Sequence, residues 1–204
     1  MSKSNETHLH FYYYIGIYFS ASITKKLDIN TSNGYYLYDK DFTKNNNKAD
    51  FEREKRDIGL CLAKKAGIGF IEWGSDVHVK SLSDAKKVKS LCDKADIKIS
   101  SYGSYFNSAV YDEGKWRDTC EIAKEMGAES IRIWLGKKNS QVTSDKEYNA
   151  LIKSTKKMCD IAEKYSLLVC PECHDNTFNN NTDAFLKIQQ DIGCDNFRTY
   201  FQSR

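Results

Sequence analysis

A carboxylate and an imidazole, Glu172 and His174, stand two residues apart directly after an apolar run that begins at Leu167. Successive side chains of a strand alternate between the two faces of a sheet, so both would point the same way at a strand end. A carboxylate in an apolar strand costs several kcal/mol unless it is paired, protonated or bound to a metal. The two residue types together therefore predict metal binding or acid–base catalysis.

Apolar segments able to form strands recur about every 30 residues, the length of one strand-and-helix unit in a (β/α)8 barrel. They begin near Gly69, Ile97, Ser130, Leu167 and Phe197. Between them, residues 85–95 and 148–162 repeat apolar side chains at the spacing of one buried helix face. The sequence thus predicts an α/β fold of TIM-barrel type with about six such units in a single domain, residues 1–204, in which residues 31–48 form a loop insertion.

Helix starts and stops agree with this alternation. Ser144 and Glu147 have the spacing of a capping box. Plausible N-caps are Asp50, Ser83 and Thr182, and glycines that could end helices are Gly67, Gly127 and Gly193.

The strand faces predict which side chains reach the barrel interior. In residues 130–136 the aliphatic side chains share one face, which helices should cover, so Arg132 and Trp134 should point inward. The same alternation predicts that Tyr102 and Gln202 point inward, and that Glu72 ends its strand at the same mouth. His78, in the loop after that strand, is a candidate substrate contact. A single Arg or Tyr inside a sheet is more often a structural hydrogen-bonding group, and a tryptophan more often fills a core, so both interpretations stay open.

Composition excludes several classes of protein. The 204 residues carry a net charge of +3 without a basic block, which gives no indication of nucleic acid binding. No stretch reaches the ~20 apolar residues of a membrane helix. The run 9–23 fits a tyrosine-rich first strand better than a signal peptide. Seven irregularly spaced cysteines favour reduced thiols, and we expect a cytoplasmic protein.

The segment Cys170-Pro-Glu-Cys-His174 also matches two short redox patterns, the Cys-x-x-Cys dithiol and the Cys-x-x-Cys-His haem attachment site. A dithiol site of the thioredoxin type should open a helix at once, whereas residues 175–181 are loop-like. Haem attachment needs an exported helical context. Both alternatives are weaker than the metal or acid–base interpretation.

Five segments together resemble the xylose isomerase-like TIM barrels, the sugar phosphate isomerases and epimerases that also include inosose dehydratases and AP endonucleases. They are Ala66-Gly-Ile-Gly-Phe-Ile-Glu-Trp73, Lys98-Ile-Ser-Ser-Tyr-Gly-Ser104, Ile131-Arg-Ile-Trp-Leu-Gly136, Pro171-Glu-Cys-His174 and Tyr200-Phe-Gln202. The resemblance covers roughly residue 50 to the end.

The resemblance implies a divalent cation, Mn²⁺ or Mg²⁺, at the barrel mouth, with Glu172 as a metal ligand and His174 near the oxygens of a sugar or sugar-phosphate substrate. It implies isomerisation or epimerisation by proton or hydride transfer next to a carbonyl. Gln202 stands where many relatives have a ligating Asp, and the residues of the seventh and eighth strands do not follow Arg204.

These departures leave an alternative: a catalytically inactive truncated barrel, or a subunit whose open edges are covered by a second copy or a complementing chain. AP endonuclease-like phosphodiesterase activity is a less favoured third hypothesis, because that chemistry uses several inward histidines.

Overall fold

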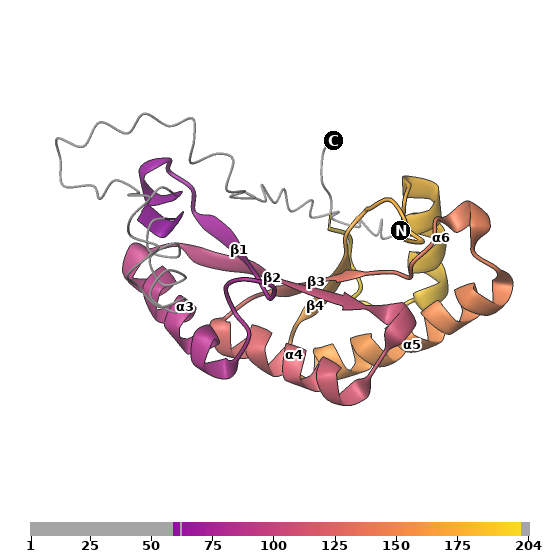
Figure 1. Ribbon diagram of the computed structural model, residues 1–204, viewed down its shortest axis with the longest axis horizontal. Coiled ribbons are helices and arrows are strands. Elements are labelled where there is room, and N and C mark those ends of the chain that lie inside the picture. Colours follow the sequence, from indigo (N-terminus) through magenta and orange to yellow (C-terminus); the bar gives the residue numbers. More distant parts are fainter. Residues whose placement is uncertain (1–58, 62, 201–204) are drawn as a thin grey trace, which may run out of the picture.

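The computed structural model describes residues 59–61 and 63–200, and these form a parallel sheet with one helix after each strand (Figure 1). The strands are β1 (Phe70–Gly74), β2 (Lys98–Asn107), β3 (Ser130–Trp134) and β4 (Leu168–Pro171). Their order in the sheet is β1-β2-β3-β4, and every pair is parallel. Parallel strands in sequence order are the arrangement of a TIM barrel, which confirms the predicted α/β fold for the described part of the chain.

The helices are α3 (Leu82–Ala95), α4 (Glu113–Met126), α5 (Asp145–Glu163) and α6 (Thr182–Ile192), with short 3-10 turns η1 (Ser108–Val110) and η2 (Ser140–Val142). Figure 1 shows α3, α4 and α5 along one side of the sheet. On that side Ile131, Ile133 and Leu135 are fully buried, as the strand-face prediction required. The other face of β3 therefore carries Arg132 and Trp134.

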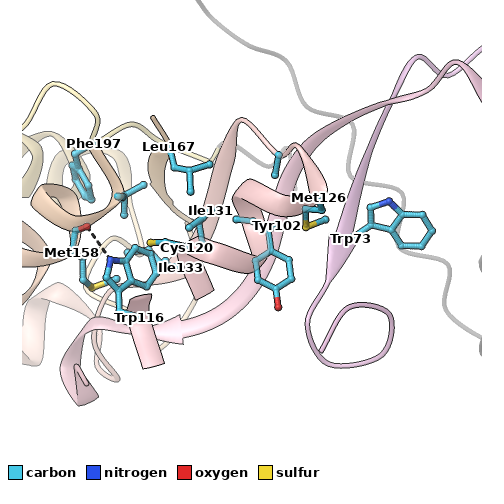
Figure 2. Close-up of a cluster of buried hydrophobic side chains, with 14 of the residues drawn as sticks. Trp73, Tyr102, Trp116, Cys120, Met126, Ile131, Ile133, Met158, Leu167 and Phe197 are labelled. Atoms are coloured by element: carbon cyan, nitrogen blue, oxygen red, sulfur yellow. Dashed lines mark hydrogen bonds between the residues drawn. The ribbon is translucent and has the colours of Figure 1, made fainter. Parts of the chain in front are cut away.

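The core between sheet and helices includes the large side chain of Trp116 in α4, which is 0% exposed (Figure 2). Its indole Nε1 donates to the carbonyl of Met158 in α5 at 2.9 Å, so the polar atom of this large side chain is satisfied. The centre of its ring also lies 4.9 Å from the centre of the Phe106 ring. This residue thereby ties two helices to the end of β2.

Most predicted helix ends are confirmed. The capping box of Ser144 and Glu147 opens α5, and Gly127 and Gly193 end α4 and α6 with positive φ. Two N-caps were misplaced: Ser81 rather than Ser83 caps α3, and Asn181 rather than Thr182 caps α6. In both cases the capping side chain accepts from the amide three residues on, where the first helical turn leaves its N–H groups unpaired.

The segment predicted to be a strand at Phe197 forms two isolated parallel bridges instead, Val169 with Phe197 and Glu172 with Tyr200. Predictions for residues 9–23, 31–48, Asp50 and Gln202 fall outside the described residues. Within the described part of the chain, no helix has the length and apolar character needed to cross a membrane.

Candidate functional site

A buried guanidinium lies at the centre of the inner face of the sheet. Arg132 of β3 is 2% exposed, and its Nε lies 3.1 and 3.3 Å from the two carboxylate oxygens of Glu72 in β1. Its Nη1 forms an ion pair with Oε2 of Glu172, which directly follows β4. Residues 60 and 40 positions away in the sequence thus converge on one side chain.

Glu72 is held from a second side by β2. The hydroxyl of Ser101 donates to Glu72 Oε2. On the same face, a Cβ at Gly103 would lie 2.8 Å from Arg132 Nη2 and 3.0 Å from Glu72 Oε1. The absence of a side chain at this position is what allows the guanidinium and carboxylate to lie against the strand.

Glu172 is fixed through both its backbone and its side chain. Its amide donates to the carbonyl of Ile133 at 3.0 Å, and its own carbonyl accepts from the side-chain amide of Asn179 at 2.8 Å. Oε2 accepts from the indole of Trp134 at 3.1 Å in addition to the guanidinium. Asn179 is fully buried. The loop after β4 therefore folds back and holds the backbone of Glu172 in place.

Aromatic rings cover the guanidinium. The Arg132 Cζ atom lies 4.9 Å from the ring centre of Tyr105 and 5.7 Å from that of Tyr200, within the range of cation–π attraction. Tyr105 has φ = 54°, at an irregularity where the pairing of β2 with β3 shifts. A non-glycine residue in this left-handed conformation is uncommon, and here it coincides with the ring being placed over the guanidinium.

His174 lies at the solvent side of this cluster. Its ring stacks on that of Trp134, with centroids 5.5 Å apart and an interplanar angle of 29°. Its Nδ1 lies 2.6 Å from the carbonyl oxygen of Asp175. A carbonyl only accepts hydrogen bonds, so this contact requires the proton on Nδ1, and in that tautomer Nε2 is an acceptor.

The loop that carries His174 is tied to the loop after β3. The amide of Asn176 donates to the side chain of Asn139 at 2.6 Å, and Ser140 donates through its amide and its hydroxyl to the side chain of Asn180. These bonds join two segments about 40 residues apart at the carboxyl ends of β3 and β4. In parallel α/β proteins this edge of the sheet carries the active site.

The prediction for Tyr102 was wrong about its direction. Its ring is buried, and its hydroxyl donates to the carbonyl of Val79 at 2.9 Å, on the helix side of the sheet. The cause is a shift in pairing after Ile99, because Glu72 pairs with Ser101 rather than Ser100. One extra residue reverses the alternation, so Ser101 faces the ion pairs and Tyr102 the helices. Burial raises the pKa of the Tyr102 hydroxyl to about 12.

The ring of His78 contacts that of Trp73, with the two ring centres 5.2 Å apart. The indole N–H of Trp73 donates to the sulfur of Cys92 in α3.

The structure thus brings Glu172, His174, Arg132 and Trp134 together and places His78 and Tyr102 on the helix side. The sequence predicts Glu72 at the same mouth, but its pairing with Arg132, from the middle of β1, is a tertiary contact that the sequence does not indicate. The roles of Tyr105, Asn179 and Tyr200 depend on a bulge, a loop and a bridge that no sequence period indicates.

The cysteines of the Cys-x-x-Cys-His pattern lie at the end of β4 and in the loop after it, and α6 begins only at Thr182. Burial raises the pKa of the Cys170 thiol to about 12 and that of Cys120 to about 12. We expect both thiols to resist iodoacetamide at pH 8 in the native protein, while the exposed Cys61 reacts, because the thiolate is the nucleophile.

Peptide mass spectrometry after a short labelling pulse would measure the three thiols separately, with urea-unfolded protein as the control in which all react. Equal labelling of Cys170 and Cys61 in the native protein would contradict this expectation and revive the dithiol interpretation.

A separate groove of about 480 Å³ lies on the helix side, between the segment before β1 and α3. Its lining includes the apolar side chains Leu60 and Leu91 and the basic side chains Lys64, Lys65 and Lys94. It contains none of the groups of the ion-pair cluster, so it has no part in the chemistry considered below.

Residues 60–203 match the family described as Xylose isomerase-like TIM barrel. The chain belongs to this family. No curated protein matches the chain at a significant level. Membership confirms the resemblance found in the sequence and the TIM-barrel class of the fold.

Several solved structures share the fold. The probable 3-DHS dehydratase AsbF from Bacillus anthracis superposes with a TM-score of 0.62 at 15% identity, over 76% of this chain and 57% of its own. A D-psicose 3-epimerase gives 0.57 at 15% identity, over 70% and 56%, and the IolI protein solved with a zinc atom gives 0.55 at 19% identity, over 70% and 55%. The chain therefore spans a little over half the length of these proteins.

The described part of this xylose isomerase-like chain does not by itself fit the cation that the family resemblance implies. Residues 59–61 and 63–200 contain no group of three or more His, Cys, Asp or Glu side chains able to hold a metal ion. The one predicted ligand among them, Glu172, has its Oε2 engaged by Arg132 and Trp134. The second ligand position considered, Gln202, lies outside this part of the chain.

Proposed function

We propose that this protein acts on a sugar or sugar phosphate as an isomerase or epimerase, by moving a proton at the carbon next to a carbonyl. The observation that carries the proposal is the continuous contact from Arg132 through Glu172 and Trp134 to His174 at the carboxyl ends of β3 and β4. Family membership and the epimerase and dehydratase folds among its structural neighbours support it.

In this proposal His174 is the acid–base group. Its Nε2 is an acceptor on an exposed ring, and the stack on Trp134 fixes the ring plane. A proton acceptor held near a C–H bond next to a carbonyl contributes about 10²–10⁴-fold to its removal. Glu172 orients this arrangement by holding the indole of Trp134, and the half-buried indole offers an apolar wall to a sugar ring.

The test is solvent deuterium uptake. The purified chain is incubated with aldoses and ketoses, free and phosphorylated, in D₂O, and NMR follows the loss of the proton at the carbon next to the carbonyl. We expect His174→Gln to slow exchange by about 100-fold or more. Glu163→Gln, at an exposed position at the end of α5, is a surface control that should leave the rate unchanged. Exchange at the same rate in His174→Gln would reject His174 as the proton acceptor.

A second candidate is a non-catalytic sugar-binding subunit. The specific observation in its favour is that Arg132 already neutralises both inner-face carboxylates, Glu72 and Glu172. Calorimetry with the same sugars separates the two: binding without deuterium uptake supports the subunit, and uptake supports the enzyme. The phosphodiesterase hypothesis gains no support, because the described residues lack the cluster of ligands that a multi-zinc centre needs.

A further inference from the structure

Two carboxylates at the inner face surround the guanidinium of Arg132 as carboxylate ligands would surround a metal ion. Glu72 and Glu172 approach from β1 and from the end of β4, and the guanidinium of Arg132 in β3 lies between them. The three side chains are 13%, 5% and 2% exposed, so water screens their charges only weakly. A buried carboxylate pair requires such a positive partner.

One oxygen of the Glu172 carboxylate is already committed to two donors. Glu172 Oε2 accepts from a guanidinium N–H and from the indole N–H of Trp134. A carboxylate oxygen has two lone pairs, so a cation could bind this atom only by displacing one of these donors. It would also have to approach a fixed positive charge in a region where repulsion between like charges is strong.

The surrounding sheet is shaped to this guanidinium. Gly103 leaves the space that Nη2 and the Glu72 carboxylate fill, and a methyl group there would lie within 3.0 Å of both. The rings of Tyr105 and Tyr200 lie against the guanidinium carbon, an environment that suits a delocalised planar cation. Strands β1 and β2 and the segment that carries Tyr200 therefore all contribute to the fit.

We infer that the Arg132 guanidinium takes the place of a divalent cation in this chain, so that Glu72 and Glu172 are neutralised by a built-in charge and the site works without bound metal. The inference rests on the proposed function only in placing the sugar at Glu172. A sugar bound there meets fixed hydrogen-bonding groups in place of an exchangeable metal, and its binding should be insensitive to EDTA.

The experiment is a titration of the full chain with MnCl₂ up to about 1 mM, read by calorimetry and by the shift in Tm. We expect no heat and no shift for the wild type or for Arg132→Lys, which keeps the charge. Arg132→Ala exposes two carboxylates to one space, and we expect it to gain a Mn²⁺-dependent rise in Tm. Arg132→Ala combined with Glu172→Gln is the matched control and should lose that gain.

Micromolar Mn²⁺ binding by the wild type that disappears in Glu172→Gln would overturn the inference. So would a folded Arg132→Ala protein that gains no response to Mn²⁺. The wild-type titration does not depend on whether the Arg132 variants fold. Failure of the deuterium-uptake test would reject the proposed reaction and leave these metal titrations unaffected, so the two proposals fail separately.

Discussion

Arg132→Met is expected to lower the free energy of unfolding by about 3–5 kcal/mol, because removing one partner of a buried ion pair leaves uncompensated charge. Here one side chain serves two carboxylates, Glu72 and Glu172. Methionine keeps much of the volume of the side chain, so the expected loss comes mainly from the charges. Urea denaturation followed by circular dichroism would measure it.

A triple variant provides the control. Arg132→Met combined with Glu72→Gln and Glu172→Gln removes the charges together, and buried ion pairs replaced in this way by neutral groups are often tolerated. We expect it to be more stable than Arg132→Met alone. If the single and triple variants lost the same stability, packing around the side chain rather than charge would account for the effect.

Trp116→Ala is expected to cost about 3–5 kcal/mol, the range for removing a large buried aromatic side chain. The residue is fully buried in α4 and its ring contacts that of Phe106. Its indole donates to the Met158 carbonyl, the bond drawn in Figure 2. The loss has two parts, a cavity and the missing hydrogen bond from the indole to a backbone carbonyl in α5. The same denaturation experiment measures it.

Trp116→Phe separates these two parts. Phenylalanine fills much of the space but cannot donate to Met158, so we expect a smaller loss, and the difference between the variants reports the cavity. If Trp116→Ala lowered the free energy of unfolding by less than about 1 kcal/mol, the contribution of this buried side chain to the core would be contradicted.

The local features of the fold could be predicted from the sequence because each depends on neighbouring residues. The alternation of apolar strands with amphipathic helices predicts the parallel sheet, and Ser144 and Glu147 open α5 as their spacing requires. Arg132 and Trp134 face inward because the aliphatic residues that alternate with them along β3 must face the helices. Glu172 and His174 were placed at a strand end for the same kind of reason.

Only the tertiary structure decided what these side chains contact. The bulge in β2 reverses its alternation, so Ser101 joins the cluster and Tyr102 leaves it. The pairing of Arg132 with Glu72 joins residues 60 positions apart, and it depends on the register of three strands, which a local pattern does not contain. The sequence alone therefore determined that Arg132, Trp134 and Glu172 reach the inner face of the sheet, but not which side chains of β2 do. The register and the bulge determined that two carboxylates share one buried guanidinium.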